Sequence, residues 1–271
     1  MIRLGLIQME SQDTIEKALE HIEKFASIAR KINCSALCFP ECVLTGYDPD
    51  RASQKAISVR HPSLGKLASM AIQTRVDLLV GFMEKSEDRY FLTHGVFRAD
   101  GAREFYRKTH LGQKEKQIFS PGSELKVFPL SCGLQAGLQL CVETHFPEIS
   151  QTLSLRGAEV IFSPHAIPMP IEKRMSVWKK ILPARGYDNR VYIASCNMWD
   201  EKRFGGGCLV CDPNGEVIAE FCENRSALLS FAIDEDALRL FRTDSASLLH
   251  RYYPRDRRPE IYFDSERKEI R

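Results

Sequence analysis

Short apolar runs alternate with amphipathic stretches through the first third of the chain. Three runs are almost wholly apolar, as in strands buried on both faces, and they lie at residues 2–9, 35–41 and 77–84. Between them, apolar residues recur every three or four positions, which predicts helices over residues 11–32 and 62–75. Asp13 and Glu16 stand three residues apart and predict a capping box at the start of the first helix.

The rest of the chain mixes hairpins with the same alternation. Asp100-Gly101 and Asn214-Gly215 each lie between two strand-like runs, as in a tight hairpin. Further strands are predicted at residues 134–141, 158–164, 191–197 and 225–234, and helices from Pro147 to near Gly157 and over residues 171–190. Strands separated by helices favour an α/β fold in which helices cover mixed sheets. No linker, low-complexity segment or fixed-period repeat interrupts this pattern, so we predict one domain over residues 1–271.

Composition adds the broad class of the protein. Hydrophobic residues make up 44% of the 271 residues and charged residues 27%, as in ordinary soluble globular proteins. The net charge of +2 gives no reason to expect nucleic acid or an anionic membrane as a partner. No apolar stretch approaches the roughly 18 residues of a membrane span, and the N-terminal residues lack a signal-peptide pattern. Nine cysteines then favour reduced thiols, and we predict a cytoplasmic protein.

Three reactive side chains stand at the ends of predicted strands. Glu41 and Cys141 end two of the apolar runs, and Lys108 follows the first hairpin. In layered α/β folds, ligands bind at the carboxyl ends of strands. A thiol, a carboxylate that can take its proton and an ammonium that can stabilise an oxyanion form a set suited to acyl transfer. The backbone N–H of Val142, beside the thiol, is a natural second oxyanion donor.

Each of these residues also has a simpler interpretation. Taken alone, Cys141 would be a small buried thiol, Lys108 a solvated hairpin lysine and Glu41 an ordinary turn acid. His145 lies four residues after Cys141 and suggests a Cys–His protease with Asn197 as the third member. The other interpretation of His145 is a packing residue near the nucleophile.

Two further motifs suggest metal or phosphate chemistry. CLVC (208–211) has the spacing of a zinc or redox pair, but an offset of three places its thiols on opposite faces of a strand. Cys34, Cys38 and Cys42 are predicted to be core thiols. The glycine run 205–207 lacks the Lys-Ser/Thr of a phosphate-binding loop and leads into a strand, which favours a turn. We therefore predict no metal site.

The residues around the three reactive side chains follow a known pattern. The segments FPECVLTGY, YRKTHL with EKQIFSPG, LCVETHFPE, RGYDNRVYIASCN and RRPEIY occur in the order and approximate spacing of the nitrilase (carbon–nitrogen hydrolase) superfamily. The chain resembles this superfamily over essentially its whole length. The resemblance implies a four-layer αββα sandwich, usually paired into a dimer, with residues 251–271 as a C-terminal extension at the dimer interface. It implies no metal and no organic cofactor.

The resemblance also implies roles. Glu41, Lys108 and Cys141 match the family's Glu–Lys–Cys triad, and Glu115 in QKEKQIFSPG matches a second glutamate that orients Lys108 or assists proton transfer. By analogy, Glu41 deprotonates Cys141, the thiolate attacks a carbonyl, and Lys108 and the Val142 N–H hold the oxyanion. Water then hydrolyses the resulting thioester.

The substrate depends on residues around the cleft. Tyr47, Val142 and His165 are predicted to contact it, and His110 either lines the pocket or caps a turn. The resemblance is nearest to the amidase and N-carbamoyl amidohydrolase branches. It implies cleavage of a non-peptide C–N bond in a small linear amide or N-carbamoyl compound, with release of ammonia or amine. The alternatives are a nitrilase acting on a C≡N bond and a catalytically silent dimeric binding module. The chain departs from the family pattern outside the triad, at Leu92, Val142 and Gly186.

Overall fold

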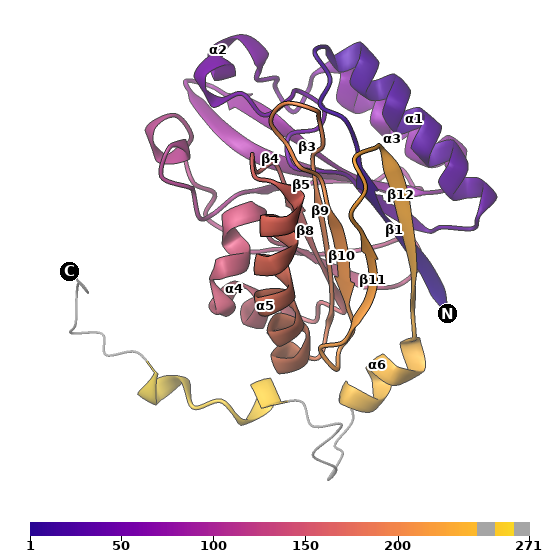
Figure 1. Ribbon diagram of the computed structural model, residues 1–271, viewed down its shortest axis with the longest axis vertical. Helices are drawn as coiled ribbons and strands as arrows, with labels where there is room; N and C mark the ends of the chain where they lie inside the picture. The colour runs from indigo at the N-terminus through magenta and orange to yellow at the C-terminus, as the bar shows by residue number, and fades with distance from the viewer. Residues whose placement is uncertain (243–252, 263–271) are drawn as a thin grey trace.

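The computed structural model describes residues 1–242 and 253–262 as two stacked six-stranded sheets with helices on their outer faces (Figure 1). The first sheet consists, in spatial order, of β12 (Ala227–Ile233), β1 (Ile2–Gln8), β2 (Ala36–Cys38), β3 (Asp77–Ser86), β4 (Arg89–Phe97) and β5 (Arg103–Arg107). The second consists of β11 (Val217–Phe221), β10 (Cys208–Cys211), β9 (Tyr192–Asn197), β8 (Val160–His165), β7 (Gln135–Leu138) and β6 (Val127–Pro129). Both sheets are mixed, because β1, β2 and β3 are parallel in one and β7, β8 and β9 in the other.

Helices cover both outer faces. The first sheet packs against α1 (Ile15–Lys31) and α3 (Pro62–Thr74), and the second against α4 (Pro147–Leu155) and α5 (Ile171–Asn189). The layer order is therefore helix, sheet, sheet, helix, and the predicted four-layer αββα sandwich is confirmed (Figure 1). The remaining helices are short: α2 (Ala52–Lys55), α6 (Glu235–Arg242), and 3-10 turns at Pro49–Arg51, Glu115–Gln117, Cys141–His145, Tyr253–Asp256 and Pro259–Ile261.

The nearly continuous apolar strands follow from burial on both faces. In β1, Leu4 and Leu6 point into the core between the sheets, while Ile7 packs under the helices. In β8, Val160 faces the inter-sheet core and Ile161 faces α4 and α5. Successive strand side chains alternate between faces, so both sets must be apolar when each face is covered.

The first helix begins differently from the prediction. Its N-cap is Thr14, whose hydroxyl accepts a hydrogen bond from the Lys17 N–H at 3.3 Å. The predicted capping box of Asp13 and Glu16 is therefore wrong by one residue. Threonine is among the preferred N-cap residues, and the extended backbone of Thr14 places its hydroxyl over the first turn.

Both predicted hairpins form, between β4 and β5 and between β10 and β11. The structure adds a longer hairpin of β3 with β4, which the sequence did not predict because its turn carries no Gly-rich signal. Two predicted strands are shorter than expected. β2 ends at Cys38 and β7 ends at Leu138, each three residues before the reactive side chain that follows it.

The nine cysteines are free thiols. Cys208 packs in the inter-sheet core and Cys211 under α5, so the predicted placement of the CLVC thiols on opposite faces is confirmed. Cys34, Cys38 and Cys42 are buried, as predicted.

Two features bear on the ends and surroundings of the domain. Among the helices in residues 1–242 and 253–262, none combines the length and apolarity needed to cross a bilayer. Of the predicted C-terminal extension 251–271, only residues 253–262 are among those described, and the rest lies outside them.

Strand direction brings the reactive residues to one edge. β5 is antiparallel to β4, which is antiparallel to β3, so β5 runs in the same direction as β2. The chain segments that follow β2 and β5 therefore leave the first sheet at the same edge. The backbone N–H of Glu41, after β2, donates to the carbonyl of His165 at the end of β8, which joins this edge to that of the second sheet.

Candidate active site

A buried ammonium group lies between two carboxylates at this edge. Lys108 Nζ donates to Glu41 Oε1 and to Glu115 Oε1, each at 2.9 Å. Lys108 and Glu41 are 1% exposed and Glu115 is 4% exposed. Glu41 follows β2, Lys108 follows β5, and Glu115 begins the 3-10 turn Glu115–Gln117. The fold therefore brings together three separate chain segments.

The turn that carries Glu41 lies directly on the first sheet. Cys42 has φ of 56°, in the left-handed region, and the N–H of Leu44 donates to the carbonyl of Gly81 at 3.0 Å. A Cβ on Gly81 would collide with the backbone N of Cys42. Glycine in β3 therefore permits the close approach that fixes the direction of the Glu41 side chain.

The IFSPG segment holds the strand that ends at Lys108. The Gly122 N–H donates to the Lys108 carbonyl at 2.7 Å, and the Lys108 N–H donates to the Leu92 carbonyl at 2.8 Å. A Cβ on Gly122 would collide with the carbonyl of Arg107. The glycine of this motif is thus required by backbone contact, and both backbone polar groups of Lys108 are paired.

The two carboxylates beside Lys108 differ in their other partners. Glu115 Oε1 accepts a hydrogen bond from the Tyr47 hydroxyl at 2.9 Å, and Glu115 Oε2 accepts one from the Gly112 N–H at 2.6 Å. Glu41 Oε2 is buried and has no hydrogen-bond partner. Glu115 is fully engaged, whereas Glu41 keeps one oxygen free to take a proton.

Cys141 stands at the start of a tight turn. It is the first residue of the 3-10 segment Cys141–His145 and has φ of 49°. The left-handed region costs a non-glycine residue on the order of 1–2 kcal/mol and is held only where the surroundings fix it. Its side chain is partly exposed. Among the described residues, the adjacent Val142 N–H has no acceptor, so it is available to an oxyanion.

Glu143 fixes this turn and was missed by the sequence analysis. Its buried carboxylate accepts hydrogen bonds from the Leu140 N–H at 2.6 Å, the Thr109 N–H at 2.7 Å and the Tyr106 hydroxyl at 2.8 Å. Leu140 precedes Cys141, and Thr109 follows Lys108. One carboxylate therefore joins the turn of Cys141 to the segment that carries Lys108. In the sequence, Glu143 is marked only by its position two residues after Cys141. That spacing alone does not predict a functional residue.

Burial and charge set the protonation of the site. Burial, partly offset by the Lys108 ammonium, raises the pKa of Glu41 to about 7, and the charge of Glu115 adds to the rise. Burial and the Glu41 carboxylate raise the pKa of the Cys141 thiol above its usual range, opposed by Lys108 and Arg174. Burial alone would lower the pKa of Lys108, but Glu41 and its other anionic neighbours raise it well above the usual value. The ammonium is thus permanent, and Glu41 titrates near neutral pH.

The predicted substrate contacts lie in different surroundings. Tyr47 and Val142 are partly exposed, Tyr47 beside Glu115 and Val142 beside the nucleophile. The His165 side chain is fully buried, with its ring centroid 4.9 Å from that of Trp178. His165 therefore packs against protein groups, and its contact with substrate stays a prediction.

The Cys–His protease arrangement does not form in the described residues. Asn197 Oδ1 accepts from the Ile167 N–H at 3.0 Å, and its Nδ2 donates to the Gly206 carbonyl at 3.2 Å. These backbone contacts occupy Asn197, and the exposed His145 has no hydrogen bond to Cys141. His110 is exposed beside Lys108, with its ring 4.5 Å from that of Phe146.

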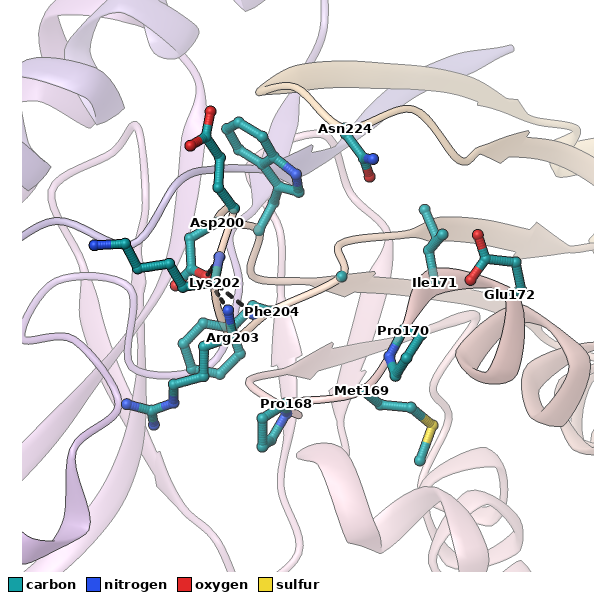
Figure 2. Close-up of a pocket in the computed structure, with 13 residues that line it drawn as sticks. Pro168, Met169, Pro170, Ile171, Glu172, Asp200, Lys202, Arg203, Phe204 and Asn224 are labelled. Atoms are coloured by element: carbon teal, nitrogen blue, oxygen red, sulfur yellow. Dashed lines mark hydrogen bonds between the residues drawn. The ribbon is translucent and has the colours of Figure 1, made fainter.

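A hollow of about 580 Å³ lies between residues 168–172 and the loop 199–205 (Figure 2). The loop is folded on Asp200, whose Oδ1 accepts from the N–H groups of Lys202 and Phe204 at 2.9 and 3.1 Å. Arg203 joins it to the predicted site, because its Nη2 donates to the carbonyl of Tyr47 at 2.6 Å. The glycine run 205–207 does not form the predicted turn, because Gly205 pairs with Trp199 in an antiparallel bridge, and Gly206 and Gly207 lead into β10 with φ of 76° and 110°. In the described part of the chain, no group of three or more His, Cys, Asp or Glu residues is arranged to hold a metal ion.

Comparison with known proteins assigns the family. The sequence profile of the carbon–nitrogen hydrolase family matches residues 3–243. The chain belongs to the carbon–nitrogen hydrolase family. A nitrilase of Pyrococcus abyssi is 29% identical to this carbon–nitrogen hydrolase over 272 residues, covering 97% of this chain and all of the relative. An N-carbamoylputrescine amidase of Arabidopsis thaliana is 26% identical over 223 residues, covering 74% of this chain and 72% of the relative. The crystal structure of an amidase from Nesterenkonia sp. superposes with a TM-score of 0.79 at 25% identity, covering 92% of this chain and 95% of the other.

Substitution of Glu143 tests its positioning role. Glu143→Gln keeps the volume but turns an amide N–H₂ toward backbone donors, which leaves at least one buried donor unpaired. We expect the free energy of unfolding to fall by about 1–3 kcal/mol and amide turnover to fall by about tenfold or more, since small displacements of reacting groups are costly. Glu148→Gln, at an exposed position of α4, is the matched control and should change neither quantity. Unchanged turnover in folded Glu143→Gln would contradict the positioning role.

Proposed function

We propose that this carbon–nitrogen hydrolase is an amidase-type enzyme that cleaves the C–N bond of a small linear amide or N-carbamoyl compound through a thioester on Cys141. The observation that carries the proposal is the unequal pair of carboxylates on Lys108. Glu41 has a free buried oxygen and a pKa near neutrality, as a general base requires. Amidases among the similar proteins support the same reaction class.

In the proposed reaction, Glu41 takes the thiol proton of Cys141 as the sulfur attacks the carbonyl carbon. The oxyanion accepts hydrogen bonds from Lys108 Nζ and the Val142 N–H. Glu41 then protonates the departing nitrogen, ammonia or an amine leaves, and an acyl thioester remains. Water, deprotonated by Glu41, hydrolyses the thioester and releases the acid and the free thiol. Glu115, held by Tyr47 and Gly112, keeps Lys108 in place through these steps.

The chemical form of the nucleophile follows from its surroundings. The raised pKa of the Cys141 thiol means that it rests in the neutral form, so the thiolate is made only when Glu41 accepts its proton. Tyr47 and Val142 are retained as proposed substrate contacts because both are partly exposed next to triad residues. His165 is retained only as a proposed contact from the enclosed side of the site.

Trapping of the acyl group tests the nucleophile. Incubation with a panel of linear amides, N-carbamoyl compounds and nitriles should release ammonia, and mass spectrometry should find an acyl adduct on the Cys141 peptide. Cys141→Ala should be folded, inactive and free of adduct. Cys222→Ala removes an exposed thiol and should keep full activity. Turnover by Cys141→Ala would exclude Cys141 as nucleophile, and turnover of nitriles alone would favour the nitrilase alternative. No turnover at all, with Cys141 inert to iodoacetamide, would leave the silent binding module.

The pH dependence of kcat/KM tests the base. The groups that act on Glu41 are Lys108, Glu115 and Glu143, and with burial they give it a pKa of about 7. Below that pH Glu41 is protonated and cannot accept the thiol proton. We therefore expect kcat/KM to fall tenfold per pH unit as the pH drops below about 7. A rate that stays constant down to pH 5 would exclude Glu41 as the group that must be ionised.

We also propose a cytoplasmic homodimer or higher homo-oligomer, with the C-terminal residues 251–271 at the interface. Free thiols throughout the chain support a reducing compartment. Light scattering should give a mass of at least twice 30.9 kDa. Removal of residues 251–271 should lower that mass to the monomer's, and an unchanged oligomer would refute their place at the interface.

A further inference from the structure

Arg174 is a buried charge without a carboxylate partner. It lies in α5, in the first turn, and is 2% exposed. In the part of the chain that the structure describes, no carboxylate forms an ion pair with it, and the group that raises its pKa against the effect of burial is the thiol of Cys141. Its Nε is buried and has no hydrogen-bond partner. Arginine stays protonated in proteins, and burial of an unpaired cation is costly. An anionic ligand that binds to Arg174 would offset this cost.

The neighbours of Arg174 orient the guanidinium without neutralising it. Nη1 lies 3.4 Å from His165 Nδ1, and the guanidinium carbon lies 5.4 Å from the Trp178 ring centroid. Burial and the nearby Arg174 charge hold the pKa of His165 well below its usual range, so this histidine is neutral. The ring of Trp178 and the neutral imidazole fix the plane of the guanidinium, which leaves the Nε edge free for a planar anion.

Arg174 is joined to the turn of Glu41 through His165, because its Nη1 lies 3.4 Å from His165 Nδ1 and the His165 carbonyl accepts the Glu41 N–H at 3.3 Å. The helix that carries it, α5, also contacts the turn Cys141–His145. The Arg174 charge lowers the pKa of the Cys141 thiol against the effect of burial, and it lowers the pKa of His145, four residues on. Arg185 lies eleven residues along α5, about three helical turns away and thus on the same face. Arg185 has Asp188 and Glu148 as acidic neighbours, whereas Arg174 has none.

The two buried cations near the site therefore differ in how their charge is compensated. Glu41 and Glu115 together outnumber the single ammonium of Lys108, while Arg174 carries an uncompensated positive charge. A substrate with a carboxylate at one end would be repelled from the Glu41 side and attracted to the Arg174 side. That orientation places the opposite, amide end at the nucleophile.

We propose that Arg174 binds a carboxylate of the substrate, so that the enzyme acts on small monoamides or N-carbamoyl compounds that carry a carboxylate at the end remote from the scissile C–N bond. This inference rests on the proposed amidase function and specifies its substrate class. A neutral amide leaves the guanidinium unpaired, and an ammonium at that end is repelled. N-carbamoylputrescine, named for the Arabidopsis relative, has such an ammonium and should be a poor substrate here.

Paired substrates test the inference. Glutaramate and pentanamide present the same amide with and without a carboxylate, and N-carbamoyl-β-alanine and N-carbamoylputrescine present opposite charges. For the wild type we expect kcat/KM about 10²-fold higher for the carboxylate member of each pair. In Arg174→Gln the advantage should vanish, mainly through KM, so that both members of each pair have similar kcat/KM. Arg174→Lys should recover only part of it, because lysine lacks the planar fork.

The control is Lys173→Gln. It removes one positive charge from the exposed neighbour of Arg174 and should leave both substrate pairs unchanged. Equal kcat/KM for both members of a pair in the wild type, or equal losses for both in Arg174→Gln, would overturn the inference while the amidase function stood. If Arg174→Gln does not fold, the wild-type preference alone decides.

Glutarate, which lacks the amide, gives a readout without turnover. Calorimetry should detect its binding to Cys141→Ala, and Cys141→Ala combined with Arg174→Lys should bind it about tenfold or more weakly. Absence of glutarate binding to Cys141→Ala would count against the anion site. If no amide reacts but glutarate still binds, the proposed amidase function is refuted while the anion-binding site at Arg174 is supported.

Discussion

The site depends on one buried ammonium shared by two carboxylates. Lys108 neutralises only one negative charge, so the pair Glu41 and Glu115 retains an excess that burial makes costly. The two carboxylates differ in how many hydrogen bonds stabilise their negative charge. Glu115 receives donors on both oxygens from Tyr47, Gly112 and Lys108, whereas Glu41 has donors on one oxygen alone. Burial raises the pKa of Glu41 to about 7, and its unpartnered oxygen suits it to accept a proton.

The rest of the fold holds that pair at one edge of the sheets, where the turn of Cys141 also lies. The triad residues are contributed by both sheets, and the backbone beside each is tied to another element: Glu41 to β8, Lys108 to β4 and Gly122. Cys42 and Cys141 have φ of 56° and 49°, so the turns that carry Glu41 and Cys141 each contain a non-glycine residue in the left-handed region. Such strain persists only in a rigid frame. The inter-sheet core behind the turns, and the clasp of Glu143 on Leu140 and Thr109, provide that frame.

Much of this was predictable from the sequence, and the exceptions have physical reasons. Continuous apolar runs and 3.6-residue periodicity predict the strands and helices, whereas the four layers and the roles of Glu41, Lys108 and Cys141 were implied by the resemblance that the motifs carry. The sequence placed Cys141 at the end of a strand, but β7 ends at Leu138, because local apolar character does not reveal where a chain leaves its ladder. Glu143 and Arg174 were missed since each acts through tertiary contact. A single acid or arginine gives no periodic signal in the sequence. Only the structure shows that several donors bond to Glu143, and that no described carboxylate pairs with Arg174.

The contrast between Lys108 and Arg174 bears on how a substrate would lie. Both are buried cations near Cys141, but Lys108 already contacts two carboxylates and has no charge to offer a substrate anion. In the proposed reaction, the remaining hydrogen-bond donor of its ammonium group serves the oxyanion, which forms only during the reaction. Arg174 contacts a neutral imidazole and an indole face, so its charge is available before reaction begins. In the proposed reaction, one cation then stabilises the transition state and the other the bound substrate.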